Sequence, residues 1–363
     1  MHVVVAPDKF AGTLTAAEAA TAIAEGWRQQ APGDELVGIP MADGGPGFVE
    51  TLHASLGGDL LAVTVSGPYG SPTPGAVLLT DGTAYVESAQ ACGLHLTPPD
   101  EREPEAATTV GVGELLAAAI DSGARRVVVG LGGSATNDGG AGMLAGLGAE
   151  SDADLCAGGS GLVGITRVDL APVRDRVAGV ELVAASDVDN PLLGLRGAIN
   201  VFGSQKGVSD ERKPALDGLL QDLAAATDRT VADAPGAGAA GGLGFALLLL
   251  GAGREPGVEL VAEAVGLAGL VAAADLVLTG EGAFDYSSSA GKVVHGVAQV
   301  AAAAIRPCVV LAGRVDVGAR EMRALGVESA YSMTELVGEQ QALAAPAGSL
   351  AALAARVART WSR

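Results

Sequence analysis

Carboxylates recur directly after short apolar runs, and this placement is the first sign of chemistry in the sequence. The carboxylates in this setting are Asp8, Asp43, Asp187, Asp189, Glu281 and Asp285. Open parallel sheets place their ligands outside the carboxyl ends of the strands. Phosphoryl transfer to an alcohol needs oxygen ligands for Mg²⁺ and a carboxylate that takes the hydroxyl proton. Any one of these residues could be an ordinary helix N-cap, but all of them together favour a site.

A glycine-rich loop, Gly130–Gly140, follows the apolar run Val127–Val129 and leads into a predicted helix. Successive glycines let backbone N–H groups converge on an anion, and a helix N-terminus adds partial positive charge. A tight turn that needs positive φ explains such a loop about equally well. The spacing also resembles a dinucleotide-binding loop, but no acidic residue follows at the required distance. A Walker loop is absent, because the pair Gly291-Lys292 is followed by Val293.

Lysine usage is a second clue. Of 22 basic residues only four are lysines, namely Lys9, Lys206, Lys213 and Lys292. In a chain that strongly prefers arginine, a retained lysine indicates a position that needs a compact ammonium group rather than the planar guanidinium of arginine. Lys213 lies in a charged stretch typical of a solvated surface. The other three lie in the motifs that follow strands, although chance alone could also place them there.

Composition excludes several classes of protein. The net charge of -20 makes a nucleic-acid or anionic-membrane partner improbable, because such surfaces are basic. Three distant cysteines and four scattered histidines indicate neither a disulfide framework nor a zinc site. The uncharged stretch 235–253 begins with poor helix formers, which argues against a membrane span. We therefore expect a cytoplasmic protein, a monomer or homodimer, with a small-molecule substrate.

The elements that would position these residues alternate between strand and helix at both ends of the chain. The run His2–Val5 predicts a buried parallel strand, and Thr15 with Glu18 has the spacing of a capping box that starts a helix to about Gln30. Between residues 68 and 256 the pattern changes, and Asp81-Gly82 predicts a hairpin.

This change of pattern predicts an α/β protein with two α/β domains. A Rossmann-like doubly wound parallel sheet, formed by residues 1–67 and 257–363, is interrupted by a larger inserted α/β domain, 68–256, with a mixed sheet. The strand at Leu60–Val65 is expected in the first of these domains.

Taken together, the motifs resemble the glycerate kinase type 1 family over nearly the whole chain. The stretches that carry the likeness include Ala6-Pro-Asp8, Met41-Ala-Asp-Gly-Gly45, Gly132-Gly-Ser-Ala-Thr-Asn-Asp-Gly-Gly140, Asp187 with Asn190-Pro-Leu192, Phe202-Gly-Ser-Gln-Lys-Gly207, Pro235-Gly-Ala-Gly-Ala-Ala-Gly-Gly242, Thr279-Gly-Glu-Gly282 and Gly291-Lys292. The resemblance implies two α/β domains with the active site in the cleft between them, and ATP-dependent formation of 2-phosphoglycerate.

The roles that we expect follow from this resemblance and the chemistry above. Catalytic roles are expected for Asp187, Asp43, Lys292, Asp8 and Lys9, with Asp187 as the base and Asp43 able to exchange roles with it. ATP phosphates are expected at Gly132, Gly133, Ser134, Ala135, Thr136, Asn137, Asp138, Gly139, Gly140, Lys206, Gly238 and Gly241. Substrate contacts are expected from Asp285, Asn190 and Arg314, and Mg²⁺ ligands from Glu281 and Asp43.

Several positions depart from the family pattern. Ala11 replaces a usual lysine while Lys9 replaces a small residue, and Pro46 and Phe48 replace Glu and Thr. Ala283 and the pair Ser287-Ser288 also differ. We expect these positions to rim the cleft. A kinase of another hydroxy acid, such as erythronate, is therefore an alternative function. A non-catalytic nucleotide-binding protein is a weaker alternative.

Overall fold

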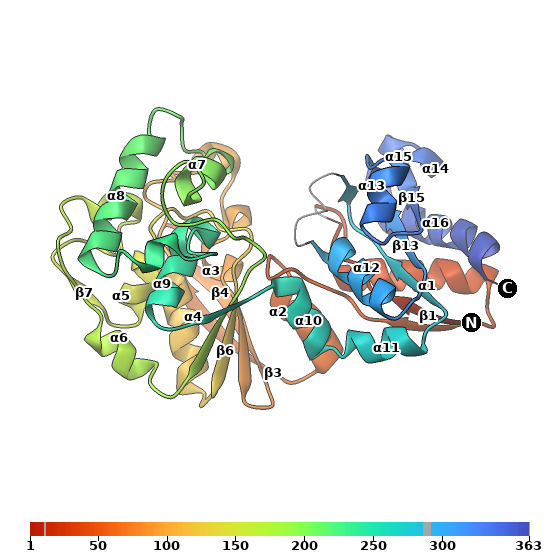
Figure 1. Cartoon of the computed structure of the whole chain (residues 1–363), viewed down its shortest axis with the longest axis horizontal. Helices are drawn as coiled ribbons and strands as arrows, with labels where there is room; N and C mark the ends of the chain where they lie inside the picture. The colour runs from red at the N-terminus through yellow and green to blue at the C-terminus, as the bar shows by residue number, and fades with distance from the viewer. Residues whose placement is uncertain (11, 286–291, 363) are drawn as a thin grey trace. The chain divides into compact units, whose positions relative to one another are not determined.

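A computed structural model describes residues 1–10, 12–285 and 292–362 of the chain (Figure 1). The chain divides into two compact units. Unit 1 comprises residues 1–43, 50–57 and 257–363, and unit 2 comprises residues 44–49 and 58–256. Helix α2 (Phe48–Leu56) begins in unit 2 and ends in unit 1. Each unit has its own sheet and its own hydrophobic core.

Unit 1 is built on a five-stranded parallel sheet in the order β15-β13-β11-β1-β2. Its strands are β1 (His2–Val5), β2 (Glu35–Gly38), β11 (Leu276–Thr279), β13 (Cys308–Ala312) and β15 (Ser329–Ser332). Its other helices and a short strand pair are α1 (Ala16–Gln30), α10 (Gly257–Ala264), α11 (Leu267–Ala273), α12 (Val293–Ala303), α13 (Ala319–Ala324), α14 (Met333–Val337), α15 (Glu339–Ala344), α16 (Pro346–Trp361), β12 (Ala283–Phe284) and β14 (Arg314–Val315).

Helices cover both faces of this sheet. Helices α1 and α16 pack side by side on one face, while α11 and α12 contact the strands from the other (Figure 1). The capping box predicted at the start of α1 is present, with Thr15 and Glu18 bonded reciprocally. A Cβ on Gly26 would come within 1.9 Å of the Ala351 carbonyl oxygen, so the close approach of α1 and α16 requires glycine there. The predicted doubly wound parallel sheet is confirmed.

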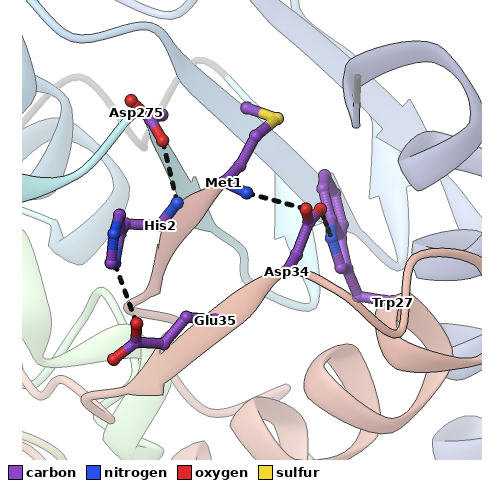
Figure 2. Close-up of polar contacts among 6 residues, drawn as sticks. All are labelled: Met1, His2, Trp27, Asp34, Glu35 and Asp275. Atoms are coloured by element: carbon purple, nitrogen blue, oxygen red, sulfur yellow. Dashed lines mark hydrogen bonds and ion pairs between the residues drawn. The ribbon is translucent and has the colours of Figure 1, made fainter.

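The amino end of this sheet is tied together by polar contacts (Figure 2). Asp34 accepts hydrogen bonds from the Met1 amine, at 2.8 Å, and from the Trp27 indole, at 2.9 Å. The N–H of His2 donates to Asp275, just before β11, and the His2 ring lies 3.1 Å from Glu35. These contacts fix β1 between its two neighbouring strands at the amino end of the sheet.

Unit 2 contains a six-stranded mixed sheet in the order β10-β9-β6-β5-β4-β3. Its strands are β3 (Asp59–Ser66), β4 (Pro72–Thr80), β5 (Thr83–Glu87), β6 (Arg126–Gly130), β9 (Glu181–Ala185) and β10 (Gly253–Glu255), with a separate pair β7 (Glu150–Ser151) and β8 (Val168–Asp169). Its helices are α3 (Ala89–Cys92), α4 (Val110–Asp121), α5 (Ala141–Gly146), α6 (Ala171–Arg176), α7 (Ala198–Phe202), α8 (Lys213–Ala226) and α9 (Leu243–Leu249). Strands β5, β6, β9 and β10 are parallel, whereas β3 and β4 are antiparallel additions.

The hairpin predicted at Asp81-Gly82 joins β4 to β5, with Thr80 opposite Thr83. Both turn residues have positive φ, as the right-handed twist of a two-residue hairpin requires. The strand at Leu60–Val65 was expected in the N-terminal sheet, and this placement is wrong. Strand β3 pairs antiparallel with β4, because the short turn from Gly67 to Ser71 returns the chain beside it.

Among the described residues, no helix is both long enough and apolar enough to cross a bilayer. The apolar stretch near residue 250 forms α9, which has only seven residues and lies in the core of unit 2.

Candidate active site

A pocket of about 490 Å³ opens at the carboxyl edge of the unit 1 sheet. Its polar wall contains all seven of the unit 1 side chains that the sequence predicted for the site, namely Asp8, Lys9, Asp43, Glu281, Asp285, Lys292 and Arg314. The structure therefore brings together residues that lie up to 306 positions apart in the chain.

Hydrogen bonds between the ends of neighbouring strands hold this wall in place. Beyond the end of β1, the N–H of Asp8 donates to the Gly280 carbonyl oxygen at 2.8 Å. The Thr279 hydroxyl donates to the Ala6 carbonyl oxygen at 2.8 Å. These bonds extend the pairing of β1 and β11 past the sheet and set the Asp8 and Glu281 loops beside each other.

Glycines in the neighbouring loops permit the close approach of two backbones. A Cβ on Gly280 would lie 2.1 Å from the Leu311 carbonyl oxygen, and one on Gly313 would lie 2.4 Å from the Gly282 carbonyl oxygen. The N–H of Arg314 donates to Gly282 at 3.0 Å. The motif after β11 and the Gly313-Arg314 pair after β13 are therefore locked together, which places Arg314 at the pocket.

Charge alternates across the polar wall. The Lys9 ammonium lies 3.8 Å from an Asp8 carboxylate oxygen and 3.7 Å from one of Asp43. Burial raises the pKa of Asp8 to about 6, and the Lys9 charge opposes this shift. Arg314 pairs with Asp316 and is largely exposed. The wall thus presents both carboxylates and cations to a ligand.

In unit 2, the glycine-rich loop after β6 is mostly internal. Thr136, Asn137 and Asp138 are fully buried, and of residues 132–140 only Gly132 and Gly133 have appreciable exposure. Backbone N–H groups from this loop donate to protein acceptors, which include the Gly44, Cys92 and Gly241 carbonyl oxygens and the Asp138 carboxylate.

Asp138 organises this interior. Its carboxylate accepts hydrogen bonds from the Thr109 N–H and hydroxyl and from the N–H groups of Gly140 and Gly142, at 2.7 to 3.2 Å. Burial raises the pKa of Asp138, and these donors oppose the shift. The start of α5 is thus satisfied by a carboxylate of the protein itself. Of the loop residues expected at the ATP phosphates, only Gly132 and Gly133 are exposed to an appreciable extent, and the phosphate contact itself stays a prediction.

Lys206 and Gly241 belong to the same interior. The Lys206 side chain is 2% exposed, and its ammonium donates to the Thr136 carbonyl oxygen at 2.7 Å. Burial lowers the pKa of Lys206 to about 8. A Cβ on Gly241 would lie 1.8 Å from the same Thr136 oxygen. Lys206 and Gly241 therefore both lie against the buried part of the loop, at Thr136, and not at its exposed tip.

Asp187, Asn190 and Gly238 lie at the carboxyl edge of β9 in unit 2. The Asn190 carbonyl oxygen accepts from the Gly238 N–H at 2.9 Å, and the Asn190 side chain donates to the Arg196 carbonyl oxygen. Asp187 is half-buried, whereas Asp189 is 73% exposed and pairs with Arg254 at 2.7 Å. Sequence reasoning missed Arg254, since nothing in its sequence surroundings places it beside β9.

The departures from the family pattern fall in different surroundings. Ala283 lines the pocket of unit 1. Phe48 was expected at the rim of the site, but it is fully buried in unit 2 and packs edge to face on Tyr85. Pro46 packs against Gly133. Ala11, Ser287, Ser288 and Gly291 lie outside the described residues.

Comparison with known proteins agrees with this architecture. Residues 3–362 match the model of the glycerate kinase family. The glycerate kinase of Bacillus subtilis (strain 168) is 40% identical over 344 residues, which cover 92% of this chain and 90% of that protein. The glycerate 2-kinase of Escherichia coli (strain K12) is 40% identical over 351 residues, which cover 93% of this chain and 92% of that protein.

A solved structure assigned as glycerate kinase 2 from Salmonella typhimurium LT2 superimposes with a TM-score of 0.84 at 37% identity, and covers 99% of this chain and 98% of that one. The resemblance that the sequence motifs indicated is confirmed. This chain is an enzyme of the glycerate kinase family.

Proposed function

We propose that the protein transfers the γ-phosphoryl group of ATP to glycerate, with Mg²⁺ as the metal, and forms 2-phosphoglycerate. The main support is the pocket of unit 1, where carboxylates and ammonium groups meet at the carboxyl edge of a parallel sheet. The name of the Escherichia coli relative, glycerate 2-kinase, motivates the choice of the 2-hydroxyl. Cytoplasmic location and a monomeric or homodimeric state stay predictions from the sequence.

The donor set of the pocket fits Mg²⁺. Mg²⁺ in kinases is held by one or two carboxylates together with substrate phosphates and water. Glu281 and Asp43 both line the pocket, and the described residues form no compact cluster of three or more His, Cys, Asp or Glu groups. Those two carboxylates would hold the ion, which supplies positive charge to the phosphate oxygens. Lys9 and Lys292 add cationic charge from the protein itself.

We propose Asp187 as the acceptor of the hydroxyl proton, with Asp43 as the alternative. Asp187 follows β9 directly and is half-buried. The Asp187→Asn variant should lower kcat by about 10²–10⁴, the usual contribution of a general base. Asp189→Asn is the matched control two residues later, and its kcat should stay within a few-fold of the wild type. Equal kcat values for the two variants would exclude Asp187 as the base.

A coupled ATP assay over a panel of small hydroxy acids tests the activity as a whole. We expect turnover with glycerate, its loss on chelation of divalent metal, and a phosphorus NMR spectrum of the product that corresponds to the 2-phosphate. Rapid turnover of erythronate with little turnover of glycerate would show that erythronate, and not glycerate, is the substrate. Nucleotide binding without turnover of any acid would refute the proposed activity.

A further inference from the structure

The pocket of unit 1 has a second, largely apolar end. Glu339, at the start of α15, also lines the pocket, but the side chains of this end are mainly apolar, namely Phe10, Met333, Ala342 and Leu343. Three of these four side chains are nearly buried, but Leu343 is 63% exposed at its surface. The Thr334 hydroxyl, also in the lining, shares a hydrogen bond with Ser332 and retains capacity for another partner.

The charged end and the apolar end of the pocket lie beside different strands of the sheet. The chain leaves β1 for β2 on one side and returns at β11 on the other, so the switch point of the sheet lies between β1 and β11. Ligands of open α/β sheets bind at such a point. Asp8 follows β1 and Glu281 follows β11, whereas Met333 begins α14 directly after the edge strand β15. The pocket therefore runs from the switch point along the carboxyl edge to the last strand.

The size of the pocket exceeds the needs of a three-carbon acid. At about 30 Å³ per water molecule, a volume of 490 Å³ corresponds to roughly 16 waters. It lies within the range of about 300–1,000 Å³ that is typical of sites for larger ligands. A ligand with a charged end and a flat apolar end would use both walls.

Much of the glycine-rich loop of unit 2 is already bonded within the protein. The N–H groups of Ala135, Gly139, Gly140 and Gly142 already donate to acceptors of the protein. The buried Lys206 ammonium is bonded to Thr136. In unit 1, by comparison, the Lys9 and Lys292 side chains both line the pocket.

From these observations we infer that the pocket of unit 1 is the nucleotide site, with the phosphates between Lys9 and Lys292 and the adenine base against Met333, Ala342 and Leu343. This inference rests on the proposed use of ATP. An apolar wall suits the faces of the base, and the Thr334 hydroxyl is available to its polar edge.

Substitutions of Leu343 test the position of the base, since an exposed side chain can be changed without disturbing the core. In Leu343→Glu and Leu343→Lys, we expect the Kd for Mg-ADP and the KM for ATP to rise about five- to twenty-fold, with the KM for glycerate within two-fold. Val163→Glu and Val163→Lys change another exposed apolar side chain, 71% exposed in unit 2, and should leave all three constants unaltered. Use of both charges separates lost contact from simple attraction or repulsion of phosphate.

Two results would overturn the inference. One is tighter Mg-ADP binding in Leu343→Lys together with weaker binding in Leu343→Glu, which would indicate only a distant charge effect. The other is a rise in the KM for glycerate alone. Photolabelling of the wild-type protein with 8-azido-ATP provides an independent measurement, and the label is expected on a peptide that contains residues 333–344. Labelling confined to peptides of unit 2 would also overturn it.

The outcomes separate this inference from the proposed function. Labelling at 333–344 without phosphorylation of any glycerate would sustain the nucleotide site and refute the activity. Phosphorylation of glycerate with labelling elsewhere would sustain the activity and refute the site.

Discussion

The two units treat the polar residues after their strands in opposite ways. In unit 1, Asp8, Lys9 and Asp43 line a pocket, where the Lys9 ammonium lies within 4 Å of both carboxylates. In unit 2, Asp138 and Lys206 follow the same kind of sequence signal but are buried and bonded to the protein. Similar local sequences thus lead to the lining of a pocket in one unit and to an internal support in the other.

The difference depends on whether the polar groups form their hydrogen bonds within the protein or face a pocket. Four donors of the protein satisfy the Asp138 carboxylate, so it has little left to offer an ion or substrate. Many glycines around it serve close packing, because a side chain on Gly241 or Gly140 would meet neighbouring atoms at 1.8 and 2.4 Å. A glycine-rich loop after a strand is therefore evidence of an anion site only when its N–H groups remain available.

The largest expected effect is on stability, at the contact between the two glycine-rich segments of unit 2. Gly241→Ala should destabilise the protein by more than about 3 kcal/mol, because the added Cβ would overlap the Thr136 carbonyl oxygen and overpacking adds to backbone strain. Gly251→Ala is the matched control, since Gly251 also has positive φ but nothing lies within 4 Å of the added atom. Its cost should be about 1–2 kcal/mol. Urea unfolding measures both.

Equal costs for Gly241→Ala and Gly251→Ala would contradict this view. Positive φ alone would then explain the glycine, and the close contact with Thr136 would not hold the loop in place.

An intermediate effect is expected from paired substitutions of the two buried carboxylates. The pKa of Asp8 is raised to about 6 chiefly by burial, so the folded state binds this proton more tightly than the unfolded state. Its ionisation therefore costs stability as pH rises from about 4 to 6, and the full cost persists above pH 6. Asp8→Asn should raise the free energy of unfolding at pH 7.5 by about 1–3 kcal/mol and lower kcat.

The gain in Asp8→Asn should vanish below about pH 4, where the wild-type carboxyl is protonated in both states. Asp138→Asn should instead destabilise the protein at every pH, because an amide NH₂ would face N–H donors that now meet a carboxylate oxygen. Denaturant titrations at pH 4 and 7.5 compare the two. Destabilisation by Asp8→Asn at pH 7.5 would show that Asp8 is a structural residue like Asp138.

Much of the fold was predictable because local signals and the global sheet agree. The capping box at Thr15, the hairpin at Asp81-Gly82 and the continuous apolar strands each have a short-range physical cause. The unit 1 wall was also predictable, because the carboxyl ends of parallel strands must meet at one edge.

The remaining features depend on tertiary context. Strand β3 resembles a continuation of the N-terminal pattern, and only its turn to β4 assigns it to the other sheet. Lys206 and Asp138 have residue types suited to a phosphate site, but burial is decided by α7, α8 and the segment after Gly236. The apolar end of the pocket escaped detection because Met333, Ala342 and Leu343 look like ordinary helix residues.

The smallest effect at neutral pH concerns the buried ammonium of unit 2. Burial lowers the pKa of Lys206 to about 8 from 10.5, so between these pH values the unfolded state binds more protons than the folded state. The wild type should therefore gain stability relative to Lys206→Met as pH rises from 8 to 10.5. At pH 7 the two should differ by about 1 kcal/mol or less, because the lost hydrogen bond to Thr136 offsets the relieved burial of charge. Unfolding free energies at pH 7 and 10 measure the difference. A constant difference would mean that the ammonium is solvated, and would contradict the view that Lys206 is an internal support of unit 2.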